Sequence, residues 1–104
     1  MKTIITGGSN YVLNLGDYRL LQALKGKITE VITGRRSEWS NKLMMHVGAD
    51  IFAQAWAGRN GIPVTICEDV AEMVERADAA VFFPGTDGIR ELAEDAGLII
   101  FTPV

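Results

Sequence analysis

An apolar segment, residues 79–83, runs directly into a loop of small residues and then into a helix. The loop contains Pro84, Gly85, Thr86 and Gly88. A helix that follows a strand at once begins with backbone N–H groups that lack partners. Those groups and the positive end of the helix dipole bind phosphate or another anion, and glycine allows the anion to approach closely. We therefore predict an anion-binding loop at residues 84–88.

A second glycine loop follows the first apolar segment of the chain. Gly7 and Gly8 would let phosphate approach the backbone, Ser9 and Asn10 would add hydrogen bonds, and Tyr11 would stack on a base or ribose. The alternative is a flexible turn with an aromatic ring packed over it. The loop matches neither GxGxxG nor the P-loop GxxxxGKS/T, so it predicts neither of those motifs.

Two arginines follow a third glycine, in the sequence Gly34-Arg35-Arg36. A guanidinium group can donate two parallel hydrogen bonds to two oxygens of one phosphate. Arg35 and Arg36, which follow the end of an expected strand, are therefore candidates for neutralising a bound anion. The alternative is a pair of solvated surface arginines.

Two carboxylates are candidates for contact with a sugar or for acid–base chemistry. Asp50 follows Gly48 in the first turn of an expected helix, where it would cap the helix or accept a ribose hydroxyl. Glu91 lies one turn into the last expected helix, where it would bind ribose, act as general acid or base, or interact with the helix dipole. If the protein is an enzyme, Glu91 and Asp50 are its predicted catalytic residues.

Other reactive side chains carry weaker signals. His46 is the single histidine and Cys67 the single cysteine, so we predict no metal site and no cofactor, and both are expected to be packing or surface residues. Trp39, Met44 and Met45 are expected to form an apolar cover or a dimer contact. We therefore expect a homodimer or a higher homo-oligomer.

The pattern of apolar and turn residues predicts strands that alternate with helices. The segment 35–47 is expected to be irregular or partly helical. The helix at 17–25 is expected to be capped by Asp17. Predicted strands cover 3–6, 28–33, 62–66, 79–83 and 98–101, and predicted helices cover 17–25, 49–59, 68–77 and 89–96.

This alternation predicts an α/β fold with a five-stranded, mainly parallel sheet and helices on both faces, in three layers. Ligands of such sheets bind beyond the carboxyl ends of the strands, near the switch in strand order. If the first, second and fourth strands are neighbours, their three glycine loops meet in one crevice.

Composition limits the classes of partner. The 104 residues suit one domain, residues 1–104, and 48% apolar residues are enough for a core. A formal charge of −3 makes a nucleic-acid polymer an unlikely partner, and no apolar run reaches the length of a membrane helix. A single cysteine, with no N-terminal signal pattern, predicts a cytoplasmic location.

The ordered motifs resemble the SLOG superfamily, the Rossmann-like group that includes the DprA/Smf proteins and the LOG phosphoribohydrolases. The likeness is strongest to its small YpsA-related branch (the YspA, or YAcAr, type) of bacteria and phages, and it spans nearly the whole chain. The motifs are T-G-G-x-x-Y at 6–11, G-A-D-x-x-A-x-x-W-A at 48–57, G-I-P-V at 61–64 and A-D-x-x-x-x-F-P-G at 77–85.

The resemblance implies a phage or prophage protein that binds a nucleotide or nucleotide-derived molecule across its glycine loops. It carries this role to Gly7, Gly8, Tyr11, Gly48, Asp50, Pro84, Gly85, Thr86 and Gly88.

The chain departs from the LOG motif P-G-G-x-G-T-x-x-E. Thr86 replaces the second glycine, Ile89 replaces the threonine, and Glu91 comes one residue early, a rotation of about 100° on a helix. We expect a nucleotide-binding or nucleotide-sensing domain. A LOG-like hydrolase of the N-glycosidic bond and a structural protein without ligand stay open as alternatives.

Overall fold

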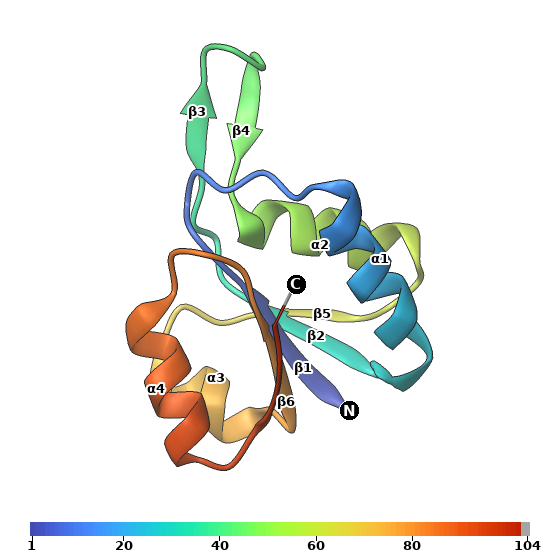
Figure 1. Cartoon of the computed structure of the whole chain (residues 1–104), viewed down its shortest axis with the longest axis vertical. Helices are drawn as coiled ribbons and strands as arrows, with labels where there is room; N and C mark the ends of the chain where they lie inside the picture. The colour runs from blue at the N-terminus through green and yellow to red at the C-terminus, as the bar shows by residue number, and fades with distance from the viewer. Residues whose placement is uncertain (103–104) are drawn as a thin grey trace.

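Strands and helices alternate along the chain in the computed structural model, which describes residues 1–102 apart from the side chain of Asp87 (Figure 1). In chain order the elements are β1 (Lys2–Thr6), α1 (Leu15–Leu24), the short 3-10 helix η1 (Lys25–Lys27), β2 (Glu30–Thr33), β3 (Glu38–Ser40), β4 (Met45–Val47), α2 (Ala49–Arg59), β5 (Val64–Ile66), α3 (Val70–Arg76), β6 (Ala79–Phe82), α4 (Asp87–Asp95) and β7 (Ile99–Phe101).

Five of the strands form one parallel sheet in the order β5-β2-β1-β6-β7, which confirms the predicted α/β class. The central strands are almost completely buried, as expected when both faces of a parallel sheet are covered. The first, second and fourth predicted strands correspond to β1, β2 and β6, and they are neighbours as the predicted crevice requires.

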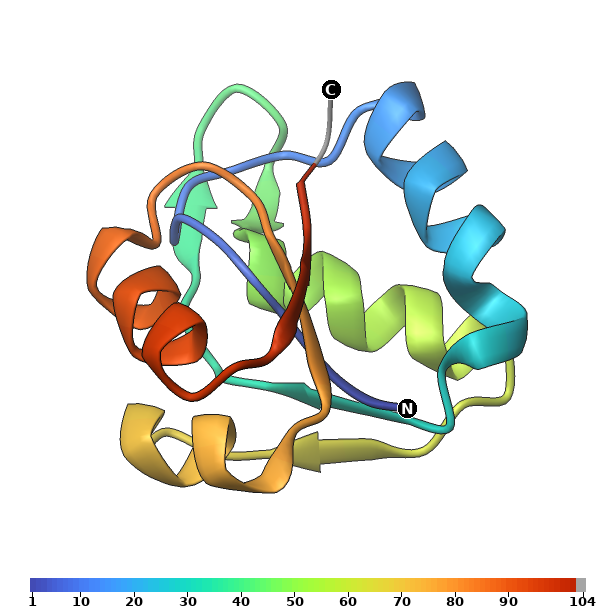
Figure 2. The same cartoon turned by 60° about the horizontal axis from the view of Figure 1, so that its bottom comes forward.

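Helices cover both faces of this sheet, giving three layers (Figure 2). Successive strand residues point to opposite faces. Ile5 therefore packs in the core under α1 and α2. Ile4 points to the other face and packs in the core under α3 and α4. Trp56 is only 2% exposed and belongs to the core under α1 and α2.

The cap of α1 differs from the prediction. Asn14, not Asp17, is the N-cap, because its side chain accepts a hydrogen bond from the Asp17 backbone N–H at 2.9 Å. The Asp17 carboxylate accepts in return from the Asn14 N–H at 2.9 Å, which completes a capping box. The helix consequently begins two residues earlier than expected.

The segment 35–47 is an antiparallel hairpin, so the prediction of an irregular or partly helical segment was wrong. Within residues 1–102, strands β3 and β4 pair only with each other, and the Leu43 N–H donates to the Ser40 hydroxyl at 3.1 Å within the connecting turn. Three-residue strands are too short to produce a clear alternating pattern. The hairpin projects from the body instead of covering the sheet (Figure 1).

Helix α4 begins at Asp87, two residues before the predicted start at Ile89. Gly88 therefore lies within the first turn of the helix and not in the preceding loop.

Within residues 1–102, none of the helices has the length and apolar character needed to cross a membrane.

Candidate functional site

The loops after β1 and β6 touch each other through their backbones. The Gly8 N–H donates to the Pro84 carbonyl at 2.7 Å, which extends the contact between the two strands into the loops. Chain order reverses between these two strands, since β2 and β5 lie on one side of β1 while β6 and β7 lie on the other. This is the switch point at which open α/β sheets bind ligands.

Gly85 makes this loop contact possible. Its φ of +100° suits glycine, and a Cβ atom built there would lie 2.7 Å from the Gly8 Cα atom. The crowding atoms belong to the protein's own backbone. The packing of one loop against the other therefore requires Gly85 whether or not a ligand binds.

Gly48, which lies between the hairpin and α2, also allows close packing of backbone segments. Its φ is +137°, and a Cβ atom would lie 2.7 Å from the Arg36 carbonyl oxygen and 2.8 Å from the Ser9 carbonyl oxygen. The Ala49 N–H donates to the Gly8 carbonyl at 3.1 Å. These contacts bring the loop after β2 and the start of α2 onto the loop after β1, so the three predicted loops do converge.

Asp50 is buried beneath these loops and does not cap α2, whose N-cap is Gly48. Its carboxylate accepts a hydrogen bond from the Thr6 hydroxyl at 2.5 Å and another from the Arg36 N–H at 3.2 Å. It also lies next to Gly34, where a Cβ atom would be 2.7 Å from the carboxylate. Asp50 thus ties the ends of β1 and β2 to α2.

The two arginines lie on the outer side of this contact. Both side chains are exposed, and the Arg36 guanidinium donates to the Gly7 carbonyl. Arg36 is therefore held against the loop after β1.

A cleft of about 180 Å³ opens between these loops and the start of α3. Its apolar lining comes mainly from α3 and α4, and its polar lining from the loops. The lining residues are Thr6, Gly34, Arg35, Arg36, Asp50, Cys67, Glu68, Val70, Met73 and Ile89.

A more open groove of about 420 Å³ continues from the cleft toward α4. The two hollows share Arg36, Val70 and Ile89, so they adjoin each other. The groove is lined by Arg36, Val70, Gly85, Thr86, Gly88, Ile89 and Leu92.

The start of α4 forms part of this groove. Thr86 is the N-cap residue, but its hydroxyl donates to the Phe83 carbonyl at 3.2 Å and makes no cap hydrogen bond. The Thr86 side chain therefore accepts no hydrogen bond from the backbone N–H groups of the first turn of α4, and these groups are suited to binding an anion.

Several predicted site residues lie elsewhere. The Ser9 hydroxyl donates to the Glu38 carboxylate at 2.8 Å, and Asn10 is exposed. Glu91 is exposed on α4, and among the described residues it lines neither the cleft nor the groove. Pro84 lines a separate hollow of about 210 Å³ together with Phe82, Phe83, Gly85, Thr86, Arg90 and Thr102.

Tyr11 is engaged by the protein itself. Its ring stacks on Phe83 with centroids 5.6 Å apart, and its hydroxyl donates to the Asp17 carboxylate at 2.7 Å. Burial, together with the hydrogen bond and the negative charge of Asp17, raises the pKa of Tyr11 to about 12. In this arrangement Tyr11 fixes the loop against α1.

One side of the cleft was absent from the sequence-based site. It comes from the end of β5 and the start of α3, and it contributes Cys67, Glu68, Val70 and Met73. The signal that could have found it is the parallel direction of β5, which brings its carboxyl end to the same edge of the sheet.

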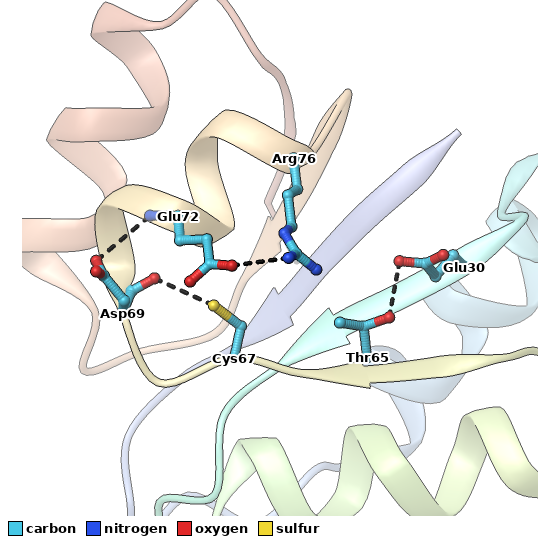
Figure 3. A network of polar contacts seen from close by, with 6 residues as sticks. All are labelled: Glu30, Thr65, Cys67, Asp69, Glu72 and Arg76. Carbon is cyan, nitrogen blue, oxygen red and sulfur yellow. Dashed lines mark hydrogen bonds and ion pairs between the residues drawn. The ribbon is translucent and has the colours of Figure 1, made fainter.

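Local hydrogen bonds hold this side in place (Figure 3). The Cys67 thiol donates to the Asp69 carbonyl at 3.4 Å, and the Asp69 carboxylate caps α3 by accepting from Ala71 N–H at 3.0 Å. Glu72 forms an exposed ion pair with Arg76 at 2.8 Å. Cys67 is buried, which agrees with its expected packing role.

Comparison of the chain with protein-family models, with curated proteins and with solved structures finds no match. Within the described part of the chain, no group of three His, Cys, Asp or Glu side chains is placed to hold a metal ion.

Proposed function

We propose that this protein is a small domain that binds or senses a nucleotide in the cleft and groove. The observation that carries the proposal is the pair of adjoining hollows beyond the carboxyl ends of the parallel strands, in which apolar side chains lie beside Arg36 and, in the groove, beside the start of α4. A nucleotide needs both kinds of lining, because its base is flat and largely apolar while its phosphate is anionic.

The lining suggests how such a ligand would lie. The base would enter the cleft between Cys67, Val70 and Met73, where apolar side chains contact its faces. The exposed carboxylate of Glu68 would accept ribose hydroxyls at the rim. Asp50 already accepts two hydrogen bonds, so its proposed part is to position Arg36 and Thr6.

The phosphate would lie between Arg36 and the first turn of α4. Arg36 lines both hollows, and its guanidinium would exchange the Gly7 carbonyl for phosphate oxygens. Gly88 is exposed, with open space where a side chain would be, so the helix backbone is accessible from the groove. Arg35 would supply a second positive charge from the loop side of the cleft.

The resemblance to the SLOG superfamily supports the same ligand class, and a phage or prophage origin rests on that resemblance alone. A cytoplasmic location fits a nucleotide ligand. The LOG-like hydrolase is less favoured, because Glu91 is exposed outside the lining of both hollows.

Isothermal titration of the purified chain with mononucleotides, cyclic dinucleotides and ADP-ribose compounds tests the proposal. We expect at least one of them to bind, and Arg36→Gln to weaken it about tenfold or more through loss of a charge-assisted hydrogen bond. Arg19→Gln, which removes the same charge from the exposed side of α1, should leave binding unchanged. Binding by no compound in the panel, or equal loss in both variants, would refute the proposed site.

Incubation with nucleoside monophosphates, followed by chromatography for free base, separates binding from hydrolysis. Release of base that is abolished by Glu91→Gln would support the enzyme alternative. Retained binding without release would support the binding domain. Neither binding nor release would favour a structural protein that has kept the fold.

A further inference from the structure

The third hollow, with a volume of about 210 Å³, adjoins the groove, because the two share Gly85 and Thr86. We call it the end hollow. Among the described residues, it has no lining residue in common with the cleft, whereas the groove shares residues with both. The groove therefore lies between the cleft and the end hollow, and the three hollows form a row.

The row crosses the switch point of the sheet. The cleft is lined by residues at the carboxyl ends of β1, β2 and β5, and the end hollow by residues at the carboxyl ends of β6 and β7. Chain order reverses between β1 and β6, so the two hollows lie on opposite sides of the reversal. Open α/β sheets bind dinucleotides across this point, with one half of the ligand on each side.

The sizes of the hollows also indicate a ligand of more than two parts. The cleft of about 180 Å³ and the end hollow of about 210 Å³ are each smaller than the roughly 300–1,000 Å³ typical of a small-molecule site. Each therefore suits one part of a ligand, with the groove of about 420 Å³ for the part that connects them. A nucleotide with its base in the cleft and its phosphate in the groove would leave the end hollow unused.

The chemistry of the end hollow suits a sugar. Pro84 is exposed and offers an apolar surface to the C–H face of a sugar ring. The Arg90 guanidinium donates to the Glu94 carboxylate at 3.1 Å and to the Thr102 hydroxyl at 3.4 Å. Because Glu94 offsets the charge of Arg90, this pair suits sugar oxygens better than a further phosphate. The Thr102 hydroxyl can both donate to and accept from a sugar hydroxyl.

We propose that the end hollow is the subsite for a second ribose, and that the ligand is a nucleotide whose diphosphate joins it to that ribose. This inference rests on the proposed function, because it keeps the base in the cleft and the phosphates between Arg36 and the start of α4. Arg90 and Thr102 bind the oxygens of the second ribose, and Pro84 packs against its ring. Dinucleotides and ADP-ribose compounds share this chemistry.

Isothermal titration with matched ligand pairs tests the subsite. The pairs are ADP with ADP-ribose, and GDP with diguanosine diphosphate; in each pair the larger ligand adds a second ribose beyond the diphosphate. We expect the larger ligand of at least one pair to bind about tenfold or more tightly than the smaller one, through added hydrogen bonds to Arg90 and Thr102. ADP and GDP carry the greater negative charge in these pairs, so charge alone would produce the opposite preference.

Two variants locate the preference in the end hollow. Arg90→Gln should remove most of it and leave the affinity for the smaller ligand unchanged. Thr102→Val, which keeps the shape of the side chain, should reduce the preference about threefold through loss of one neutral hydrogen bond.

Arg76→Gln is the matched control for Arg90→Gln. Arg76 forms an ion pair with Glu72 at 2.8 Å, four residues apart on α3, just as Arg90 does with Glu94 on α4. The two arginine side chains are similarly exposed, at 51% and 43%, and within the described residues Arg76 lines none of the three hollows. The control should therefore bind both members of each pair as the parent chain does.

The outcomes separate this inference from the proposed function. Binding of mononucleotides or cyclic dinucleotides with no preference for a second ribose would overturn the subsite and leave the proposed function standing. Equal effects of Arg90→Gln and Arg76→Gln would also overturn the subsite. Binding by none of these compounds would overturn both.

Discussion

Replacing Gly85 with alanine tests whether loop-to-loop packing, and not ligand approach alone, requires glycine after β6. A Cβ atom at this position would lie 2.7 Å from the Gly8 Cα atom and 3.0 Å from the Gly8 nitrogen. Both are backbone atoms, and the Gly8 N–H is held by the Pro84 carbonyl at 2.7 Å. The loops cannot separate without breaking that hydrogen bond.

Two terms set the size of the effect. Alanine at a φ of +100° is disfavoured by about 1–3 kcal/mol, and loss of the hydrogen bond adds about 1 kcal/mol. We expect the free energy of unfolding to fall by about 3 kcal/mol, a large part of the roughly 5–15 kcal/mol typical of a domain. The melting temperature should fall by about 15 °C.

Gly58→Ala is the matched control. Gly58 lies inside α2, and a Cβ atom there would meet nothing within 4 Å. Alanine is the better helix former by about 1 kcal/mol, so this variant should melt about 5 °C higher than the parent. Circular dichroism melts and urea titrations of both variants provide the measurement. A Gly85→Ala protein as stable as the parent would refute the packing argument.

Two further substitutions test the polar contacts around the site. Asp50→Ala should lower the free energy of unfolding by about 2–3 kcal/mol in urea titrations, because the buried Thr6 hydroxyl and a backbone N–H lose their acceptor; an unchanged midpoint would contradict this assignment. Since the pKa of Tyr11 is raised from 10.0 to about 12, its contribution to stability is complete below pH 10 and is lost as the pH rises toward 12. Tyr11→Phe should therefore lose less stability than the parent over that range, and parallel curves would show that folding does not raise the pKa of Tyr11.

The order of strands and helices could be predicted from the sequence, because buried strands, amphipathic helices and glycine ends leave local patterns. The meeting of the three loops also followed, once β1, β2 and β6 were taken as neighbours, since parallel strands end at one edge of a sheet. The hairpin of β3 and β4 could not be predicted, because three-residue strands paired only with each other leave too little periodicity.

The contacts inside the site depended on the tertiary structure. Thr6 and Asp50 are 44 positions apart, and nothing in either local sequence indicates that one donates to the other. The sequence marked glycines as openings for a ligand, but Gly48 and Gly85 are crowded by backbone from other loops. Local patterns record which residues form a strand, a turn or a helix. Which loop atoms meet is decided by the register of the strands and the path between them, and only the folded chain fixes these.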